Sequence, residues 1–271
     1  MKTLSKTSAI LLATMAILLH SPRFATKASA VEPQKMNVVL LGDSNLSTGG
    51  DDCTGERSWS KWFKELFQPK TCVSYARSGA TWTNNALTKH DTKENIARVG
   101  NSNVIYNQVN RFDEAYKNGT QSEPSLIIVA CGTNDAWFQS QRPQMYAETT
   151  DKIFKLPLQD LLMKKVNQVT TLAESVRYNC EILRYHFPDA RILLLTPLQS
   201  VQGTEAKIQK VGDVIEDCGK RMGIDVIRLD KICPIKAADE RIKKHYTIDG
   251  THTSVVGAKM VGEKIAELLK N

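Results

Sequence analysis

Short apolar runs bounded by turn residues recur along the chain and predict buried β-strands. Five such runs span residues 37–41, 72–76, 126–131, 192–195 and 226–229. A strand that is apolar on both faces is typical of a parallel sheet covered on each side by helices. The runs therefore predict one buried parallel sheet.

The segments between these runs carry apolar residues at helical spacing. The longest stripe is Leu172, Val176, Cys180, Leu183 and Phe187, which Pro188 ends. Further helices are expected over residues 58–67 and 104–116, and a last one that starts after Ser254 and runs through Leu268. Strands that alternate with helices predict an α/β fold, a three-layer α/β/α sandwich around a doubly wound, mainly parallel five-stranded sheet.

Two connections, residues 80–102 and 136–157, are too long for simple turns. Both are polar with scattered aromatic residues. Loops of this kind often form the walls or lid of a functional site, and ordinary surface decoration is the alternative.

Composition indicates a globular protein with a single domain after the N-terminal segment. The chain has 271 residues, 41% of them hydrophobic and 24% charged. Its net charge of +7 comes largely from the first 30 residues, which hold four basic and no acidic side chains. The remainder has 32 basic and 29 acidic side chains, a balance that gives no general affinity for nucleic acid or anionic lipid.

The N-terminus has the pattern of a secretory signal peptide over residues 1–30. Basic Lys2 precedes an apolar run over residues 9–19, and small residues lead to a cleavage site after Ala30. The run is shorter than the approximately 20 residues of a membrane-spanning helix, so stable membrane insertion is not expected. We expect a mature domain over residues 31–271 in a secreted or periplasmic location; an uncleaved anchor is the alternative.

The six cysteines become potential disulfide partners in an oxidising compartment, but six cysteines allow 15 full pairings. Position suggests Cys53 with Cys72 beside the first strand, and Cys218 with Cys233 around the last. The remaining two lie in a strand and a helix and are expected in the core. No Cys-x-x-Cys pair supports a zinc or redox site.

Polar residues follow three predicted strands directly and precede the last helix. In an open parallel sheet, ligands bind outside the carboxyl ends of the strands, so these positions are candidates for a site. The four blocks are Gly42-Asp43-Ser44-Asn45, Arg77-Ser78-Gly79-Ala80, Gly132-Thr133-Asn134-Asp135 and Asp249-Gly250-Thr251-His252.

These blocks contain the residue types of a serine hydrolase. A serine hydroxyl needs a histidine base, and the histidine needs a third group to orient it. Ser44, His252 and Asp249 supply these types, and the last two are three positions apart. Taken alone, Asp249 as a helix-capping acid and His252 as a surface histidine are the less favoured alternatives.

In order and context the four blocks resemble the SGNH, or GDSL-type, hydrolase family, with Asn45 where leucine is commoner. The resemblance covers most of the mature chain and implies a flavodoxin-like fold. It also implies catalytic Ser44, His252 and Asp249, and an oxyanion hole formed by the Ser44 and Gly79 backbone N–H groups and the Asn134 amide. Asp43 and Asp135 are expected to hold their loops. No cofactor or metal is implied.

Trp82, Trp137, Phe138 and Tyr146 are candidates for the walls of a substrate site, or for ordinary packing. The leading hypothesis is an exported serine esterase that acts on an ester of a small molecule or glycan, most simply an O-acetylated carbohydrate. The oligomeric state stays open.

Three alternatives remain from the sequence. One is a lipase, lysophospholipase or thioesterase of the same family. Another is a catalytically inactive carbohydrate-binding protein. The third is a metal phosphoesterase, which four mature histidines and the absence of a His-x-His pair disfavour.

Overall fold

The fold was analysed in a computed structural model of the chain, which describes residues 32–93 and 99–270. The expected signal peptide lies outside the described residues. Everything below concerns the compact unit that begins at Glu32.

The centre of this unit is a five-stranded parallel sheet with the order β2-β1-β3-β4-β5. This confirms the expected doubly wound sheet, and the order is that of flavodoxin-like folds. The direction in which successive strands are added reverses between β1 and β3, which leaves a crevice at their carboxyl ends. The strands are β1 (Asn37–Gly42), β2 (Thr71–Ser74), β3 (Leu126–Ala130), β4 (Arg191–Leu195) and β5 (Asp225–Ile227).

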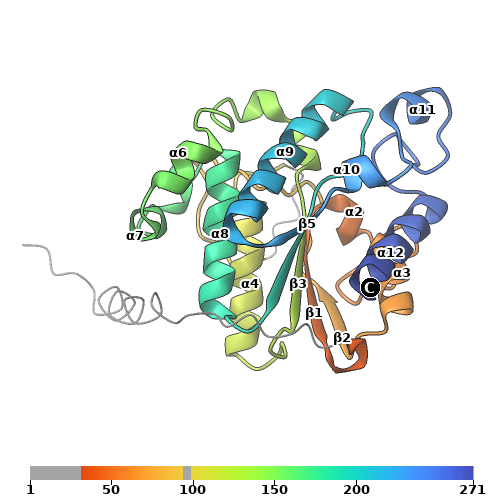
Figure 1. The fold of residues 1–271 in the computed structure, drawn as a ribbon, viewed down its shortest axis with the longest axis horizontal. Helices are drawn as coiled ribbons and strands as arrows, with labels where there is room; N and C mark the ends of the chain where they lie inside the picture. The colour runs from red at the N-terminus through yellow and green to blue at the C-terminus, as the bar shows by residue number, and fades with distance from the viewer. Residues whose placement is uncertain (1–31, 94–98, 271) are drawn as a thin grey trace, which may run out of the picture. The chain divides into compact units, whose positions relative to one another are not determined.

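Helices cover both faces of the sheet (Figure 1). One face carries α4 (Ile105–Lys117), α8 (Leu172–His186) and α9 (Glu205–Met222), and the other carries α3 (Trp59–Phe67) and α12 (Val255–Lys270). The helices α3, α4, α8 and α12 lie within one or two residues of the expected segments. Polar caps explain two of their starts, because Ser58 accepts from Ser60 N–H and Thr171 accepts from Glu174 N–H.

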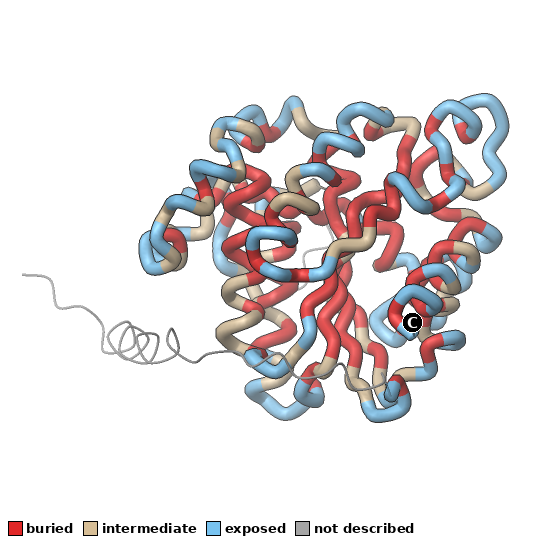
Figure 2. The backbone as a smooth tube through the Cα atoms, in the orientation of Figure 1, coloured by how far each residue is buried: buried red, intermediate tan, exposed pale blue. Residues whose placement is uncertain are grey.

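Alternation along the strands divides the core into two layers, and the three central strands, β1, β3 and β4, are buried almost throughout (Figure 2). Val39 and Leu41 of β1 face α4, α8 and α9, whereas Val38 and Leu40 face α3 and α12. Each layer removes apolar surface from water, and this burial is the main stabilising contribution to the fold.

The remaining helices are short, and several were not expected. They are α2 (Ser44–Ser47), α5 (Thr133–Trp137), α6 (Thr150–Lys155), α7 (Leu158–Leu162), α10 (Leu229–Ile232) and α11 (Ala237–Ile242), with 3-10 turns at Pro33–Lys35, Gln139–Gln141 and Val166–Gln168. The connection over residues 136–157 is thus partly helical, because Thr149 caps α6 by accepting from Lys152 N–H. By contrast, residues 80–93 and 99–102 contain no helix and, apart from the isolated bridge at Thr81, no strand.

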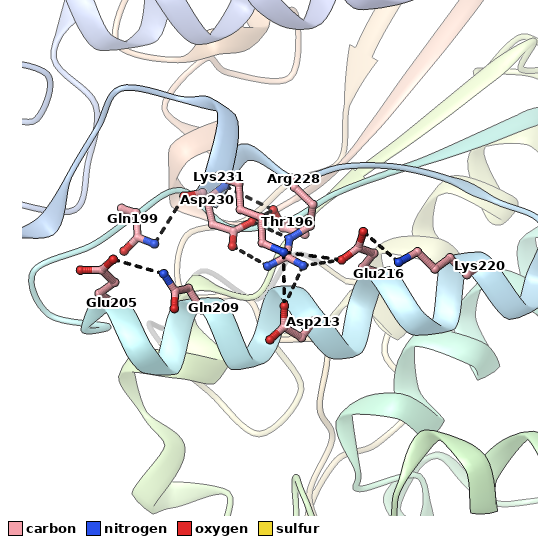
Figure 3. Close-up of polar contacts among 10 residues, drawn as sticks. All are labelled: Thr196, Gln199, Glu205, Gln209, Asp213, Glu216, Lys220, Arg228, Asp230 and Lys231. Atoms are coloured by element: carbon pink, nitrogen blue, oxygen red, sulfur yellow. Dashed lines mark hydrogen bonds and ion pairs between the residues drawn. The ribbon is translucent and has the colours of Figure 1, made fainter.

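A buried cation ties β5 and α10 to α9 (Figure 3). The side chain of Arg228 is 7% exposed and donates to Asp230, Asp213 and Glu216 at 2.6–2.8 Å. Asp230 is fully buried and also accepts from Thr196 at the end of β4, 2.6 Å away. Burial disfavours the charged guanidinium, but these carboxylates outweigh it and raise the pKa of Arg228 above its ordinary value.

The cysteines separate into one adjacent pair and four isolated thiols, all free. Cys53 Sγ and Cys72 Sγ lie 3.8 Å apart, so their pairing stays a prediction. The suggested pairing of Cys218 with Cys233 is wrong, because the two side chains pack in core layers on opposite faces of the sheet. Cys131 and Cys180 are core residues, as expected.

Among the described residues, we find no helix with the length and apolar character needed to cross a membrane.

Candidate active site

A pocket of about 480 Å³ opens at the carboxyl ends of β1 and β3, and residues of all four sequence blocks line it. Its size lies within the range of pockets that bind small molecules. The lining residues are Ser44, Thr48, Arg57, Ser78, Gly79, Val99, Asn134, Trp137, Phe138, Ile248, Asp249, His252 and Thr253.

Three of these side chains form a continuous hydrogen-bonded chain. His252 Nε2 lies 2.9 Å from Ser44 Oγ, and His252 Nδ1 lies 2.6 Å from Asp249 Oδ2. Residues 208 positions apart in the sequence thus meet because β1 and the loop before α12 end at the same edge of the sheet. This geometry allows the imidazole to accept the Ser44 proton while Asp249 orients the ring.

Asp249 is held in its ionised form by the turn that contains it. Partial burial pushes its pKa upward, but hydrogen bonds from the His252 N–H, the His252 ring and the Thr251 N–H outweigh burial, and the pKa lies below its ordinary value. Its Oδ1 accepts both backbone N–H groups, at 2.8 and 2.9 Å. Its Oδ2 is left for the imidazole.

Ser44 stands at the first position of α2, directly after β1. Asp43 caps this short helix by accepting from Asn45 N–H at 3.1 Å. The Ser44 N–H precedes the first intrahelical bond and donates to no described residue. An unpaired N–H beside the Ser44 hydroxyl is a suitable donor to an oxyanion.

Gly79, which follows β2, and Asn134, which follows β3, also line the pocket. Gly79 has φ +81°, a conformation that glycine adopts without strain, and its N–H donates to none of the residues that the structure describes. Asn134 Nδ2 donates to Ala80 O at 2.9 Å, which fixes the amide against the loop that contains Gly79. The second amide hydrogen is available to a ligand.

The two other aspartates of the blocks hold loops. Asp135 accepts from the N–H groups of Trp82 and Thr83 and from the Thr83 hydroxyl, at 2.7–3.0 Å. Burial raises the pKa of Asp135, and burial also raises that of Asp43 to about 6, with hydrogen bonds from Thr133 and Asn45 opposing.

The aromatic candidates divide between pocket and core. Trp137 and Phe138 line the pocket and stack on each other, with ring centroids 4.9 Å apart. Trp82, expected in the wall, is fully buried, and its indole N–H donates to Cys131 O at 3.1 Å. It therefore packs in the core beside the site and is not among the residues that line the pocket. Tyr146 likewise packs against the core layer that includes α8 and α9.

Comparison with known families identifies the chain. The GDSL-like lipase/acylhydrolase family matches residues 40–260, which is most of the sequence. The chain belongs to this family. As a GDSL-type hydrolase it is a carboxylic ester hydrolase. Comparison with the curated proteins found no match.

Several solved structures share the fold of this GDSL-type hydrolase at low identity. A Lactobacillus plantarum protein is 13% identical (TM-score 0.55; 87% of this chain and 97% of that chain covered). A possible lipase from Chitinophaga pinensis is 15% identical (TM-score 0.54; 86% and 97%). The acetyl xylan esterase AlAXEase is 15% identical (TM-score 0.53; 86% and 99%). At such identities the likeness concerns the fold.

The sequence did not single out several residues that shape this site. Gln108 of α4 makes two 2.8 Å hydrogen bonds to the backbone of Gly42, which holds the end of β1. Asn45 accepts from Thr253 N–H at 3.1 Å, and Arg57 and Ile248 line the pocket. Asn45 stands in the first block, but its contact with Thr253 could not be foreseen, and no local motif marks Gln108, Arg57 or Ile248, which reach the site through the tertiary fold.

Across residues 32–93 and 99–270, no group of three or more His, Cys, Asp or Glu side chains is arranged to hold a metal ion.

Proposed function

We propose that this GDSL-type hydrolase is a serine esterase that works through an acyl-enzyme on Ser44. The observation that carries the proposal is the hydrogen-bonded chain from Ser44 Oγ through His252 to Asp249. In this mechanism His252 Nε2 accepts the hydroxyl proton as Ser44 Oγ attacks the ester carbonyl carbon. Asp249 stabilises the imidazolium that forms.

The carbonyl oxygen then becomes an oxyanion that needs donors in place beforehand. The Ser44 N–H, the Gly79 N–H and the Asn134 amide are the proposed donors; Ser44 and Asn134 stand at the starts of α2 and α5, and Gly79 lies in the turn after β2 whose Ala80 O accepts from Asn134. When the tetrahedral intermediate collapses, His252 gives its proton to the leaving alkoxide. Water then attacks the acyl-Ser44 ester by the same route, and the acid and free serine are released.

For the substrate we propose an acetyl ester of a carbohydrate. The stacked, half-buried rings of Trp137 and Phe138 support it, because aromatic faces suit the apolar faces of sugars. The acetyl xylan esterase among the structural neighbours shows that a similar fold is found in an enzyme of that name. The signal-peptide pattern of residues 1–30 supports export, after which the mature chain would begin at Val31.

A second candidate is a lipase-type activity on longer acyl chains. Ile248 favours it, since this residue lines the pocket and is 49% exposed. An exposed apolar side chain beside a nucleophile can contact an acyl chain.

A panel of p-nitrophenyl esters with acetyl, butyryl and longer chains separates these candidates, run beside acetylated xylan, pectin and sialic acid. The proposal predicts the highest kcat/KM for the acetyl ester, release of acetate from at least one glycan, and no turnover by Ser44→Ala. Preference for long chains would instead establish the lipase-type activity. Binding of a glycan without hydrolysis of any ester would contradict both.

A further inference from the structure

Arg57 stands at the pocket on a backbone that is fixed to both halves of the proposed catalytic machinery. The Thr253 hydroxyl donates to Arg57 O at 2.6 Å, one residue after His252. The next residue, Ser58, is fully buried and donates to Asn45 O and Leu46 O at 3.1 and 3.0 Å, just after Ser44. The backbone from which the Arg57 side chain extends is therefore rigid.

The charge of Arg57 is not balanced within the pocket. Asp249 is the one carboxylate among the lining residues, and both of its oxygens are engaged by His252 and Thr251. Arg57 is exposed and forms no ion pair with a described residue, and the same holds for its exposed neighbour Glu56. A long, mobile cation at a concave site attracts anionic ligands.

The hydrogen bond to Thr253 also places Arg57 on one side of the proposed reaction. His252 protonates the leaving alkoxide, so the alcohol part of the ester lies on the His252 side. The carbonyl oxygen points toward Gly79 and Asn134, where the oxyanion forms. The backbone of Arg57 is anchored to Thr253 and Arg57 lines the pocket, so we assign its side chain to the alcohol part of the ester.

We propose that Arg57 binds a carboxylate on the alcohol part of the substrate, so that the preferred ester is an acetylated acidic sugar of the uronic acid type. A guanidinium matches a carboxylate with two parallel N–H···O bonds. This inference rests on the proposed esterase function and names its substrate class. The fixed backbone reduces the entropy lost when the side chain binds.

The test compares two esters that differ only at C6, acetylated methyl glucuronoside with a carboxylate there and acetylated methyl glucoside with a neutral hydroxymethyl group. We expect the wild type to show a kcat/KM about tenfold higher for the acidic ester, as for a charge-assisted contact at a partly exposed site. Arg57→Gln should bring this ratio close to unity, and Arg57→Glu should invert it. Arg241→Gln, at an exposed arginine of α11 that does not line the pocket, is the matched control and should keep the wild-type ratio.

A second measurement needs no variant. The wild-type ratio should fall toward unity at about 0.5 M salt, because screening weakens an exposed ion pair. If the Arg57 variants fail to fold, an unchanged ratio in high salt overturns the proposal by itself.

The outcomes also separate this inference from the esterase function. Equal wild-type rates on both sugars, or a preference that survives in Arg57→Gln, would overturn the role of Arg57 and leave the esterase intact. Failure of the wild type on p-nitrophenyl acetate as well would remove the proposed function itself.

Discussion

Asn45 Oδ1 accepts a hydrogen bond from the backbone N–H of Thr253 at 3.1 Å. The two residues follow Ser44 and His252 directly, and both are buried. This single contact joins the first turn of α2 to the loop before α12. The distance between Ser44 Oγ and His252 Nε2 therefore depends on a bond made by their sequence neighbours.

Asn45→Ala is expected to lower kcat/KM about tenfold and the free energy of unfolding by about 1–3 kcal/mol, because it leaves the buried Thr253 N–H without a partner. Ester hydrolysis and urea unfolding measure the two effects. Asn167→Ala removes a surface amide contact to Ala86 O and is the control, with little change expected in either. If Asn45→Ala kept the wild-type kcat/KM and free energy of unfolding, the hydrogen bond between Asn45 and Thr253 would not position Ser44 and His252.

Asn134→Ala should lower kcat by about 10²- to 10³-fold with a smaller change in KM, since the amide is needed when charge develops on the substrate oxygen. Steady-state kinetics on p-nitrophenyl acetate measure both constants. Asn84→Ala is the matched control, because Asn84 also donates a buried amide N–H to a carbonyl, Val169 O, but does not line the pocket. An effect of Asn134→Ala on KM alone would make this residue a substrate-binding one.

Asp43→Asn should change how stability depends on pH. Burial raises the pKa of Asp43 from 3.8 to about 6 in the folded protein, so the favourable contribution of this carboxyl is present below pH 3.8 and is lost as pH rises through 6. The variant keeps an oxygen that can accept from Asn45 N–H but does not ionise.

The free energy of unfolding of Asp43→Asn minus that of the wild type should therefore be about 2–3 kcal/mol larger at pH 7 than at pH 4. Urea unfolding at the two pH values measures this. Asp160→Asn, at an exposed acid of α7, should show a much smaller difference. A constant offset between Asp43→Asn and wild type would contradict the raised pKa.

Arg228→Ala is expected to destabilise the fold by about 3–5 kcal/mol, because it leaves the fully buried Asp230 carboxylate without its cation. Arg191→Ala removes an arginine whose ion pair with Asp225 is exposed, and should cost less than about 1 kcal/mol. Chemical denaturation of both variants tests the contrast. If both variants lost a similar free energy of unfolding, burial would not determine how much these ion pairs stabilise the fold.

The sheet and its main helices could be predicted from sequence because burial on both faces leaves a clear pattern. The apolar run over residues 126–131 contains β3, which ends at Ala130, and the stripe from Leu172 to Phe187 matches α8, which ends one residue earlier. The four blocks were recognisable because short motifs at strand ends must meet at one edge of a parallel sheet. The structure brings Ser44, His252 and Asp249 together there.

The failures concern features that depend on the third dimension. An aromatic side chain such as Trp82 is typical of the wall of a substrate site, but here its indole is buried in the core and donates to Cys131 O, just after β3. Cys218 and Cys233 flank one strand in sequence and lie on opposite faces of the sheet in space. α6 and α7 are too short for a periodic pattern to register. Arg57 was missed because tertiary contacts bring it to the pocket, from Thr253 to its own carbonyl and from Ser58 to the start of α2.

The most direct test of the proposed mechanism is peptide mapping by mass spectrometry after reaction with a p-nitrophenyl phosphonate, an activated analogue of the tetrahedral intermediate. We expect one phosphonyl group on the peptide that contains Ser44, loss of esterase activity in proportion to labelling, and labelling slowed by at least about 10³-fold in His252→Ala. Complete inactivation with the adduct on another residue, or His252→Ala labelling at the wild-type rate, would contradict the assignment of Ser44 and His252.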